Sequence, residues 1–115
     1  MKLACEFPPD RPGCIVSRVE GTFDADGADL LWESVAQVVD DETRFVVFDF
    51  SDVSVLTSAA LGILIRLRTR LQGFGGGLAI FGCSDKVREI IDIVMLAEVL
   101  GVRDTPDEAF AAIER

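Results

Sequence analysis

The sequence contains no histidine and no tyrosine, and only three of its residues are cysteines. Without histidine, a Ser-His-Asp triad lacks its usual base, and metal sites built on imidazole are excluded. Cys5, Cys14 and Cys83 are widely spaced and form no Cys-x-x-Cys pair, which argues against a zinc site or a redox dithiol. We expect them to be small buried side chains; a contact between Cys5 and Cys14 on adjacent strands is the alternative.

Basic residues are also scarce, because 11 Lys and Arg stand against 20 Asp and Glu, for a formal net charge of -9. Such a charge is unsuited to nucleic acid or to an anionic membrane surface. The uncharged stretch at residues 53–65 is shorter than the ~20 residues needed to span a bilayer. The opening MKLACEF meets acid and proline too early for a signal peptide. We therefore expect a cytoplasmic protein with basic protein partners, and neither nucleic-acid nor membrane binding.

The 115 residues suit one domain, which we place at residues 1–115. Strand-like segments lie at residues 1–7, 14–20, 45–50 and 78–82, with a short candidate at 99–102. Helical patterns separate the later ones, and a last helix begins near residue 105. This alternation predicts an α/β domain with about four helices. Its sheet should have four to five strands and be mixed and mostly parallel, with an antiparallel N-terminal pair.

The periodicity of the first three helices predicts which side chains are buried. The expected stripes are Leu31, Val35, Val38 and Val39 in the first helix, Ala60, Leu61, Leu64, Leu67 and Leu71 in the second, and Val87, Ile90, Ile91 and Val94 in the third. Asp24 and Asp26 suit the start of the first helix, and Ser84 suits the N-cap of the third.

Other motifs are weak candidates for chemistry. The glycine run at residues 73–77 leaves a helix instead of opening one, so a turn explains it better than a phosphate loop. DADGAD at residues 24–29 lacks the closing Glu of a calcium loop. Asp49 and Asp52 are a lone carboxylate pair, and Cys83 has no histidine to activate it. We therefore expect no enzyme, no catalytic or metal-binding residue and no cofactor.

Thr57 and Ser58 are adjacent hydroxyls where a strand passes into a helix. One of them can cap the helix, but a cap needs only one. Residues 53–84 contain no acid, and their charged residues are Arg66, Arg68 and Arg70. A phosphate at this helix start would meet free N–H groups, the positive end of the dipole and nearby cations.

The segment FVVFDFSDVSVLTSAALGILIRL, residues 45–67, resembles the centre of the STAS domain, the family of bacterial anti-sigma-factor antagonists. In that family an Asp-x-Ser-x-Val strand leads to an Asp-Ser-Ser-Gly-Leu-Gly turn. The matching residues here are Asp49, Ser51, Val53, Leu61 and Gly62. Ser58 takes the position of the phosphorylatable hydroxyl. Thr57, Ala59 and Ala60 depart from the turn motif, with Thr57 in place of an acid.

The resemblance covers nearly the whole chain. Gly21, Phe23 and Asp24 resemble a Gly-x-Leu-Asp segment before the first helix. Gly82, Ser84 and Val87 resemble the start of the third helix. The closing segment is matched by Leu96, Leu100, Val102 and TPDEAF, although Met95 stands where a glycine is usual.

The resemblance implies partner switching. The unmodified domain would bind an anti-sigma factor of the serine-kinase ATPase type, and phosphorylation of Ser58 (Thr57 as second choice) would release it until a phosphatase acts. The alternative is a STAS scaffold or ligand-sensing domain that is never phosphorylated. The expected docking residues are Gly21, Phe23, Asp24, Ser54, Thr57, Ser58, Gly62, Ile63, Arg66 and Ser84. One core accounts for the helix stripes, so we expect a monomer.

Overall fold

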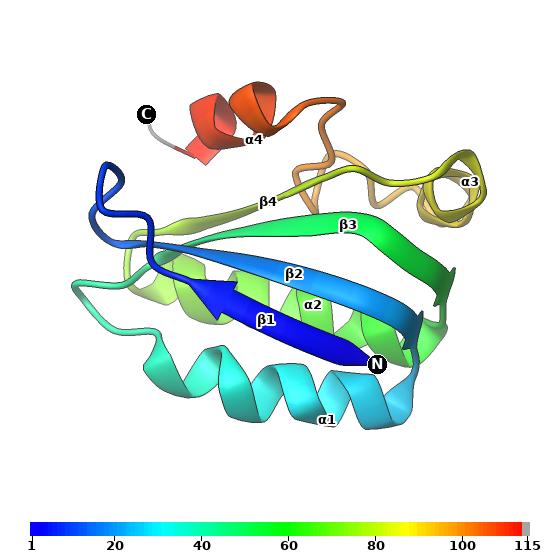
Figure 1. Cartoon of the computed structure of the whole chain (residues 1–115), viewed down its shortest axis with the longest axis horizontal. Coiled ribbons are helices and arrows are strands. Elements are labelled where there is room, and N and C mark those ends of the chain that lie inside the picture. The colour runs from blue at the N-terminus through cyan, green and yellow to red at the C-terminus, as the bar shows by residue number, and fades with distance from the viewer. Residues whose placement is uncertain (114–115) are drawn as a thin grey trace.

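A computed structural model describes residues 1–113, which build one mixed β-sheet with helices on both faces (Figure 1). Its strands within this part of the chain are β1 (Lys2–Glu6), β2 (Cys14–Phe23), β3 (Phe45–Leu56) and β4 (Gly77–Phe81). They lie in the order β1-β2-β3-β4, with β1 and β2 antiparallel and the other pairs parallel. The predicted mixed, mostly parallel sheet is thus confirmed.

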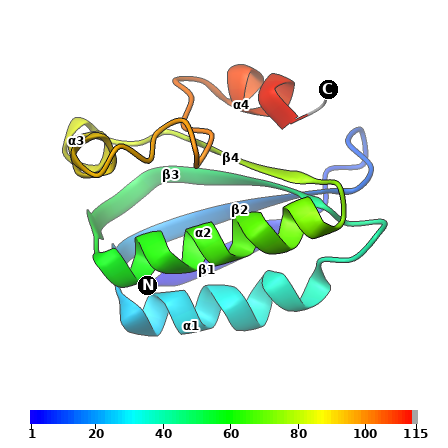
Figure 2. The ribbon, with the colours of Figure 1, turned by 180° about the vertical axis from the view of Figure 1, so that it is seen from behind.

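The helices are α1 (Ala25–Ser34), the 3-10 turn η1 (Ala36–Val38), α2 (Ser58–Gly73), α3 (Asp85–Ile93) and α4 (Pro106–Ile113). Helices α1 and α2 lie side by side under one face of the sheet, and α4 covers part of the other (Figures 1 and 2). The β3 segment FVVFDF carries apolar residues on both faces because both are covered there. The entire predicted stripe of α2 is buried.

The first helix is shorter than predicted. It ends at Ser34, and η1 follows, so the chain turns before the stripe is complete. Val35 and Val39 are buried as expected, but Val38 is 42% exposed, so its placement in the core was wrong. Valine is β-branched and a poor helix former, and three valines stand within these five residues. The tighter 3-10 turn lets two of them reach the core while the third faces solvent.

The segment at residues 99–102 is not a strand. It makes an isolated parallel bridge between Ile80 and Val102. Gly101 has a φ of 65°, which breaks the extended conformation, and a side chain there would stand 2.5 Å from the Leu78 carbonyl oxygen. The sheet therefore has four strands within residues 1–113.

The third helix also ends earlier than its apolar stripe. Val87 and Ile91 are buried and Ile90 packs partly against the core. Val94 is 46% exposed, because α3 ends at Ile93 and Met95 turns the chain through a left-handed conformation (φ 59°). The expectation that Val94 belongs to the stripe was wrong.

None of the three cysteines, all within the described residues, forms a disulfide, and one of them is in the core. Cys14 is buried, Cys83 is half-buried and Cys5 is exposed. Cys5 lies on the edge strand β1, where its sulfur is 3.3 Å from the hydroxyl of Ser17. The burial expected for Cys5 was therefore wrong. Because β1 is an edge strand with a neighbouring strand on one side only, most of its side chains stay exposed.

Candidate functional site

The junction between β3 and α2 places two hydroxyls in different roles. Thr57 is the N-cap of α2, and its side-chain oxygen accepts a hydrogen bond of 3.4 Å from the backbone N–H of Ala60. The same hydroxyl donates to the backbone carbonyl of Phe23 at 2.9 Å, and the Thr57 backbone N–H donates to that carbonyl at 3.1 Å. Thr57 thus holds the start of α2 against the end of β2.

Ser58 is the first residue of α2 and its side chain is exposed. Within residues 1–113 its hydroxyl has no hydrogen-bond partner. Since Thr57 already caps the helix, Ser58 has no structural task of the kind that places serine at a helix start. Its oxygen is free for a chemical modification or for a partner, at the positive end of the α2 dipole.

The loop after β2 lies directly beside this junction. In the parallel β2–β3 register, Gly21 faces Val53 and Phe23 faces Leu56, with an irregularity between Gly21 and Thr22. Asp24 then caps α1, accepting a 3.0 Å hydrogen bond from the Gly27 N–H. The structure therefore brings residues 21–24 next to residues 54–58, two segments that both contain expected docking residues.

Phe23 does not belong to this surface. It is fully buried and its ring stands edge-on to Phe50, with centroids 6.1 Å apart. Its assignment as a docking residue was wrong. Phe23 joins Ile15 and Val19 in the core on the helix-covered face of β2, where burial of its ring stabilises the fold. Ser54, in contrast, is exposed.

The outer face of α2 continues from Ser58. Among its exposed residues, Ser58, Gly62, Ile65 and Arg66 follow the helical spacing over the first turns of the helix. Ile63 is only 8% exposed and belongs to the core, so its assignment as a docking residue was wrong. Ile65, one turn after Gly62, is a large apolar residue that is 37% exposed. We refer to Ser58, Gly62, Ile65 and Arg66 as the α2 face.

Trp32 of α1 extends the α2 face. The Arg66 guanidinium carbon lies 4.2 Å from the centre of the Trp32 ring, a cation–π geometry. This pairing holds Arg66 against α1 and places a half-exposed aromatic ring beside it. The sequence analysis did not identify Trp32. The sequence did contain a signal for it, because the lone tryptophan follows Leu31 of the buried stripe. A residue in that position lies at the edge of the stripe and is partly exposed.

Ser84 is exposed and caps α3, where its hydroxyl accepts a 3.2 Å hydrogen bond from the Val87 N–H. It follows β4, whose carboxyl end lies at the same end of the sheet as that of β3, because the two strands are parallel. The loop before it packs against β3: a side chain on Gly82 would stand 2.4 Å from the Ser51 hydroxyl. Ser84 thus lies at the same end of the sheet as Ser58, where its hydroxyl already serves as a cap.

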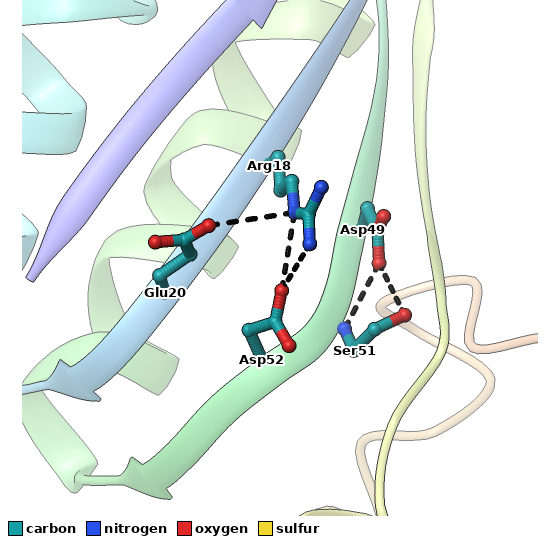
Figure 3. A network of polar contacts seen from close by, with 5 residues as sticks. All are labelled: Arg18, Glu20, Asp49, Ser51 and Asp52. Carbon is teal, nitrogen blue, oxygen red and sulfur yellow. Dashed lines mark hydrogen bonds and ion pairs between the residues drawn. The ribbon is translucent and has the colours of Figure 1, made fainter.

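Asp49 and Asp52, the carboxylates considered for acid–base chemistry, both accept hydrogen bonds from other residues of the sheet (Figure 3). Asp49 accepts hydrogen bonds from the N–H and the hydroxyl of Ser51, at 2.9 and 2.6 Å. Asp52 accepts from the Arg18 guanidinium, and Glu20 lies 3.6 Å from the same group. The hydrogen bond to Asp52 is the main cause that raises the pKa of Arg18.

Cys83 is unsuited to nucleophilic chemistry, because burial raises the pKa of its thiol to about 11. Within residues 1–113, His, Cys, Asp and Glu side chains form no group of three that could hold a metal ion. In the same part of the chain, every helix is too short or too polar to cross a bilayer.

Comparison with known proteins gives consistent results. A family model described as "STAS domain" matches residues 9–109. BtrV of Bordetella bronchiseptica, which carries the name of an anti-sigma factor antagonist, is 24% identical over 102 residues, covering 89% of this chain and 88% of that protein. The crystal structure of an anti-sigma factor antagonist from Mycobacterium paratuberculosis has a TM-score of 0.82 at 25% identity, covering 99% of this chain and 94% of the other.

The fold is also that of SpoIIAA, an anti-sigma factor antagonist. Its unphosphorylated form has a TM-score of 0.81 at 17% identity, covering 96% of this chain and 95% of the other. The phosphorylated form of SpoIIAA from Bacillus has a TM-score of 0.71 at 16% identity, covering 95% and 98%. At these identities the likeness concerns the fold.

Proposed function

Since the chain belongs to the STAS domain family, we propose that it is an anti-sigma factor antagonist that works by partner switching in the cytoplasm. Unmodified, it binds an anti-sigma factor of the serine-kinase ATPase type and thereby frees a sigma factor. Phosphorylation of Ser58 by that kinase ends the complex, and a phosphatase restores it. The names of BtrV and of the Mycobacterium protein support the general role.

The observation that carries the proposal is that two adjacent hydroxyls have different roles. Thr57 caps α2 and binds the Phe23 carbonyl, whereas Ser58 is exposed and has no partner within residues 1–113. Modifying Ser58 leaves the cap intact, so the fold survives the change. Modifying Thr57 would remove both of its hydrogen bonds, which favours Ser58 as the phosphorylated residue.

The start of α2 is suited to a phosphate. Backbone N–H groups and the positive end of the dipole face an anion at the first helical position. The first turn of α2 contains no acidic residue that would repel it. A phosphate brings about -1.5 to -2 charges into the partner's contact surface, where desolvation of an unpaired charge costs several kcal/mol. Since each ~1.4 kcal/mol is tenfold in affinity, micromolar binding is abolished without unfolding.

The proposed docking surface is the α2 face with its neighbours at the same end of the sheet. Gly62 supports this assignment, since a glycine inside a helix lowers stability relative to alanine, and a side chain at Gly62 would meet nothing within 4 Å. Packing within residues 1–113 therefore gives no reason for a glycine there, whereas close approach of a partner does. Ile65, Arg66 and Trp32 supply an apolar, a cationic and an aromatic group beside it, and arginine and tryptophan are enriched at binding hot spots. The other proposed contacts are Gly21, Asp24, Ser54, Thr57 and Ser84.

The decisive experiment uses the full chain and each small ATPase kinase encoded beside a sigma factor in its genome. With kinase and Mg-ATP, we expect a mass gain of about 80 Da, carried by the peptide that contains Ser58. The matched controls are Ser58→Ala, which should not be labelled, and Thr57→Ser, which should be. Complex formation measured before and after labelling should fall at least about a hundredfold. Labelling that persists in Ser58→Ala would refute the proposed site.

The alternative function is a docking domain that is never phosphorylated. It is favoured by one departure from the family motif, since Thr57 stands where the family carries an acid before the phosphorylated residue. Tight binding of an anti-sigma factor together with no labelling by any of those kinases would support this alternative and refute the phosphorylation step.

A further inference from the structure

The three arginines of α2 have different surroundings. Arg66 stacks on Trp32, and the Arg70 side chain donates a 2.9 Å hydrogen bond to the Ala36 carbonyl. Arg68 is half-buried, and within residues 1–113 no carboxylate, carbonyl or ring is in contact with its guanidinium. Two of the three are thus explained by packing against α1 or η1, and Arg68 is not.

Arg68 lines a cavity of about 370 Å³ at the end of the sheet where β3 and β4 begin. Arg103, from the segment that bridges to β4, lines the same cavity. The remaining lining includes Phe45, Gln72, residues 75–77, Glu98 and Val99. This volume lies within the usual range for sites that hold a small molecule.

Two guanidinium groups that line one cavity favour the binding of an anion there. Within the described residues, neither forms an ion pair with a carboxylate, although the chain carries an excess of acids. Arg103 uses one N–H on the carbonyl of Val102, at 3.0 Å, which orients the group and leaves its other donors free. Glu98 also lines the cavity without pairing with either arginine.

From this geometry we propose that the cavity binds a small organic phosphate. The forked N–H donors of Arg68 and Arg103 match the oxygens of a phosphate group, which can accept from both. Gln72 and Glu98 can bind hydroxyl groups on the rest of the molecule, and Phe45 and Val99 give its carbon skeleton an apolar wall.

The glycine loop lines the cavity but offers it no hydrogen-bond donors. The N–H groups of Gly75, Gly76 and Gly77 already bond to the carbonyls of Gln72, Leu71 and Arg44, at 2.9, 2.8 and 3.0 Å. The loop therefore does not cradle the phosphate, which agrees with its assignment as a turn.

The cavity is separate from the proposed docking surface. Phe45 begins β3, whereas Ser58 follows the end of that strand. Along α2, Arg68 stands ten residues beyond Ser58, which corresponds to about 15 Å of helix. Binding at the cavity does not depend on the proposed function, and Ser58→Ala should leave it unchanged.

Isothermal titration of the full chain with ribose 5-phosphate and glycerol 3-phosphate tests the proposal, with ribose, glycerol and citrate as comparison ligands. We expect saturable 1:1 binding of a phosphate ester, with little binding of the unphosphorylated parents or of citrate. Arg68→Gln and Arg103→Gln should each weaken it at least about tenfold. Arg66→Gln, which removes the same charge elsewhere on α2, should change it less than about twofold. Thermal unfolding of each variant verifies that it is folded.

Three results would overturn the assignment. One is the absence of saturable binding by either phosphate ester at millimolar concentration. Another is an equal loss in Arg66→Gln, because the effect would then come from overall charge. The third is equal affinity for citrate, because the site would then accept anions without recognising phosphate. None of these outcomes bears on Ser58, so the two proposals are tested independently.

Discussion

Thr57 and Phe23 are joined twice, because both the hydroxyl and the backbone N–H of Thr57 donate to the Phe23 carbonyl, at 2.9 and 3.1 Å. Through this one oxygen, the end of β2 is fixed to the start of α2. The same hydroxyl accepts from the Ala60 N–H. The position of Ser58 relative to the loop at residues 21–24 therefore depends on Thr57.

Replacing Thr57 with valine removes the cap and the hydroxyl bond but keeps the shape of the side chain. We expect Thr57→Val to lower the free energy of unfolding by about 1–2 kcal/mol, measured by urea denaturation, because an orphan N–H and a partly buried carbonyl lose a partner. Thr57→Ser is the matched control and should lose under about 1 kcal/mol. A larger loss in Thr57→Ser than in Thr57→Val would show that the methyl group, and not the hydroxyl, stabilises the junction.

Ser58 gives the opposite pattern, with little effect on stability and a large one on binding. Ser58→Ala should change the free energy of unfolding by less than about 0.5 kcal/mol, since the hydroxyl has no partner within residues 1–113. Ser58→Asp should raise it by about 0.3–1 kcal/mol at low salt, because a negative charge faces the positive end of the α2 dipole.

The same Ser58→Asp variant should bind the anti-sigma factor at least about tenfold more weakly than Ser58→Ala does. Denaturation and a binding titration on the same protein samples separate the two effects. If Ser58→Asp lost both stability and binding, local unfolding would explain the result and charge repulsion would not be needed.

The Cys83 thiol links stability to alkaline pH. Burial raises its pKa from 9.0 to about 11, so as pH rises through this window the unfolded chain loses the proton first. The folded state then binds more protons than the unfolded state, and the free energy of unfolding falls as pH increases from about 9 to about 11. Below pH 9 this contribution is fully present.

Urea denaturation at pH 8 and pH 10 measures this effect. Cys83→Ala should show a smaller fall between the two pH values than the unchanged chain, because its difference in proton binding is gone. Cys5→Ala, at an exposed position, is the matched control and should keep the larger fall. Identical pH profiles for all three proteins would mean that Cys83 ionises equally in both states.

The sequence predicted the sheet and α2 because their signals are local. The unbroken apolar run of β3 and the five-residue stripe of α2 each specify a buried element without knowledge of its neighbours. The start of α2 was predicted as well, although which hydroxyl caps it was not. That choice depends on the Phe23 carbonyl, which lies 34 residues away along the chain.

The features that the sequence did not predict depend on contacts between residues far apart in the chain. Ile63 and Ile65 both lie beside the α2 stripe, and only the packing of the sheet and α1 decides that the first is buried. Phe23 was placed on the surface by a motif match, although its position on the covered face of β2 favours burial. Arg68 and Arg103 line the same cavity because the segment before Arg103 makes a single bridge to β4. No local sequence pattern predicts that bridge.

Gly62 offers the sharpest test of the α2 face, because folding and binding should respond to its replacement in opposite directions. Gly62 is exposed in the middle of α2, and a side chain there would meet nothing within 4 Å. Gly62→Ala should therefore raise the free energy of unfolding by about 0.5–1 kcal/mol, through helix propensity and lost freedom of the unfolded chain.

If the anti-sigma factor packs closely on the α2 face, the added methyl group separates the two surfaces. Gly62→Ala should then bind at least about fivefold more weakly despite its greater stability. Gly73→Ala is the matched control, since a side chain there also meets nothing within 4 Å. It lies at the far end of α2 from Ser58, and its binding should be unchanged. A Gly62→Ala protein that is both more stable and equally tight in binding would place the partner elsewhere, because a closely packed surface cannot accept an extra methyl group without loss.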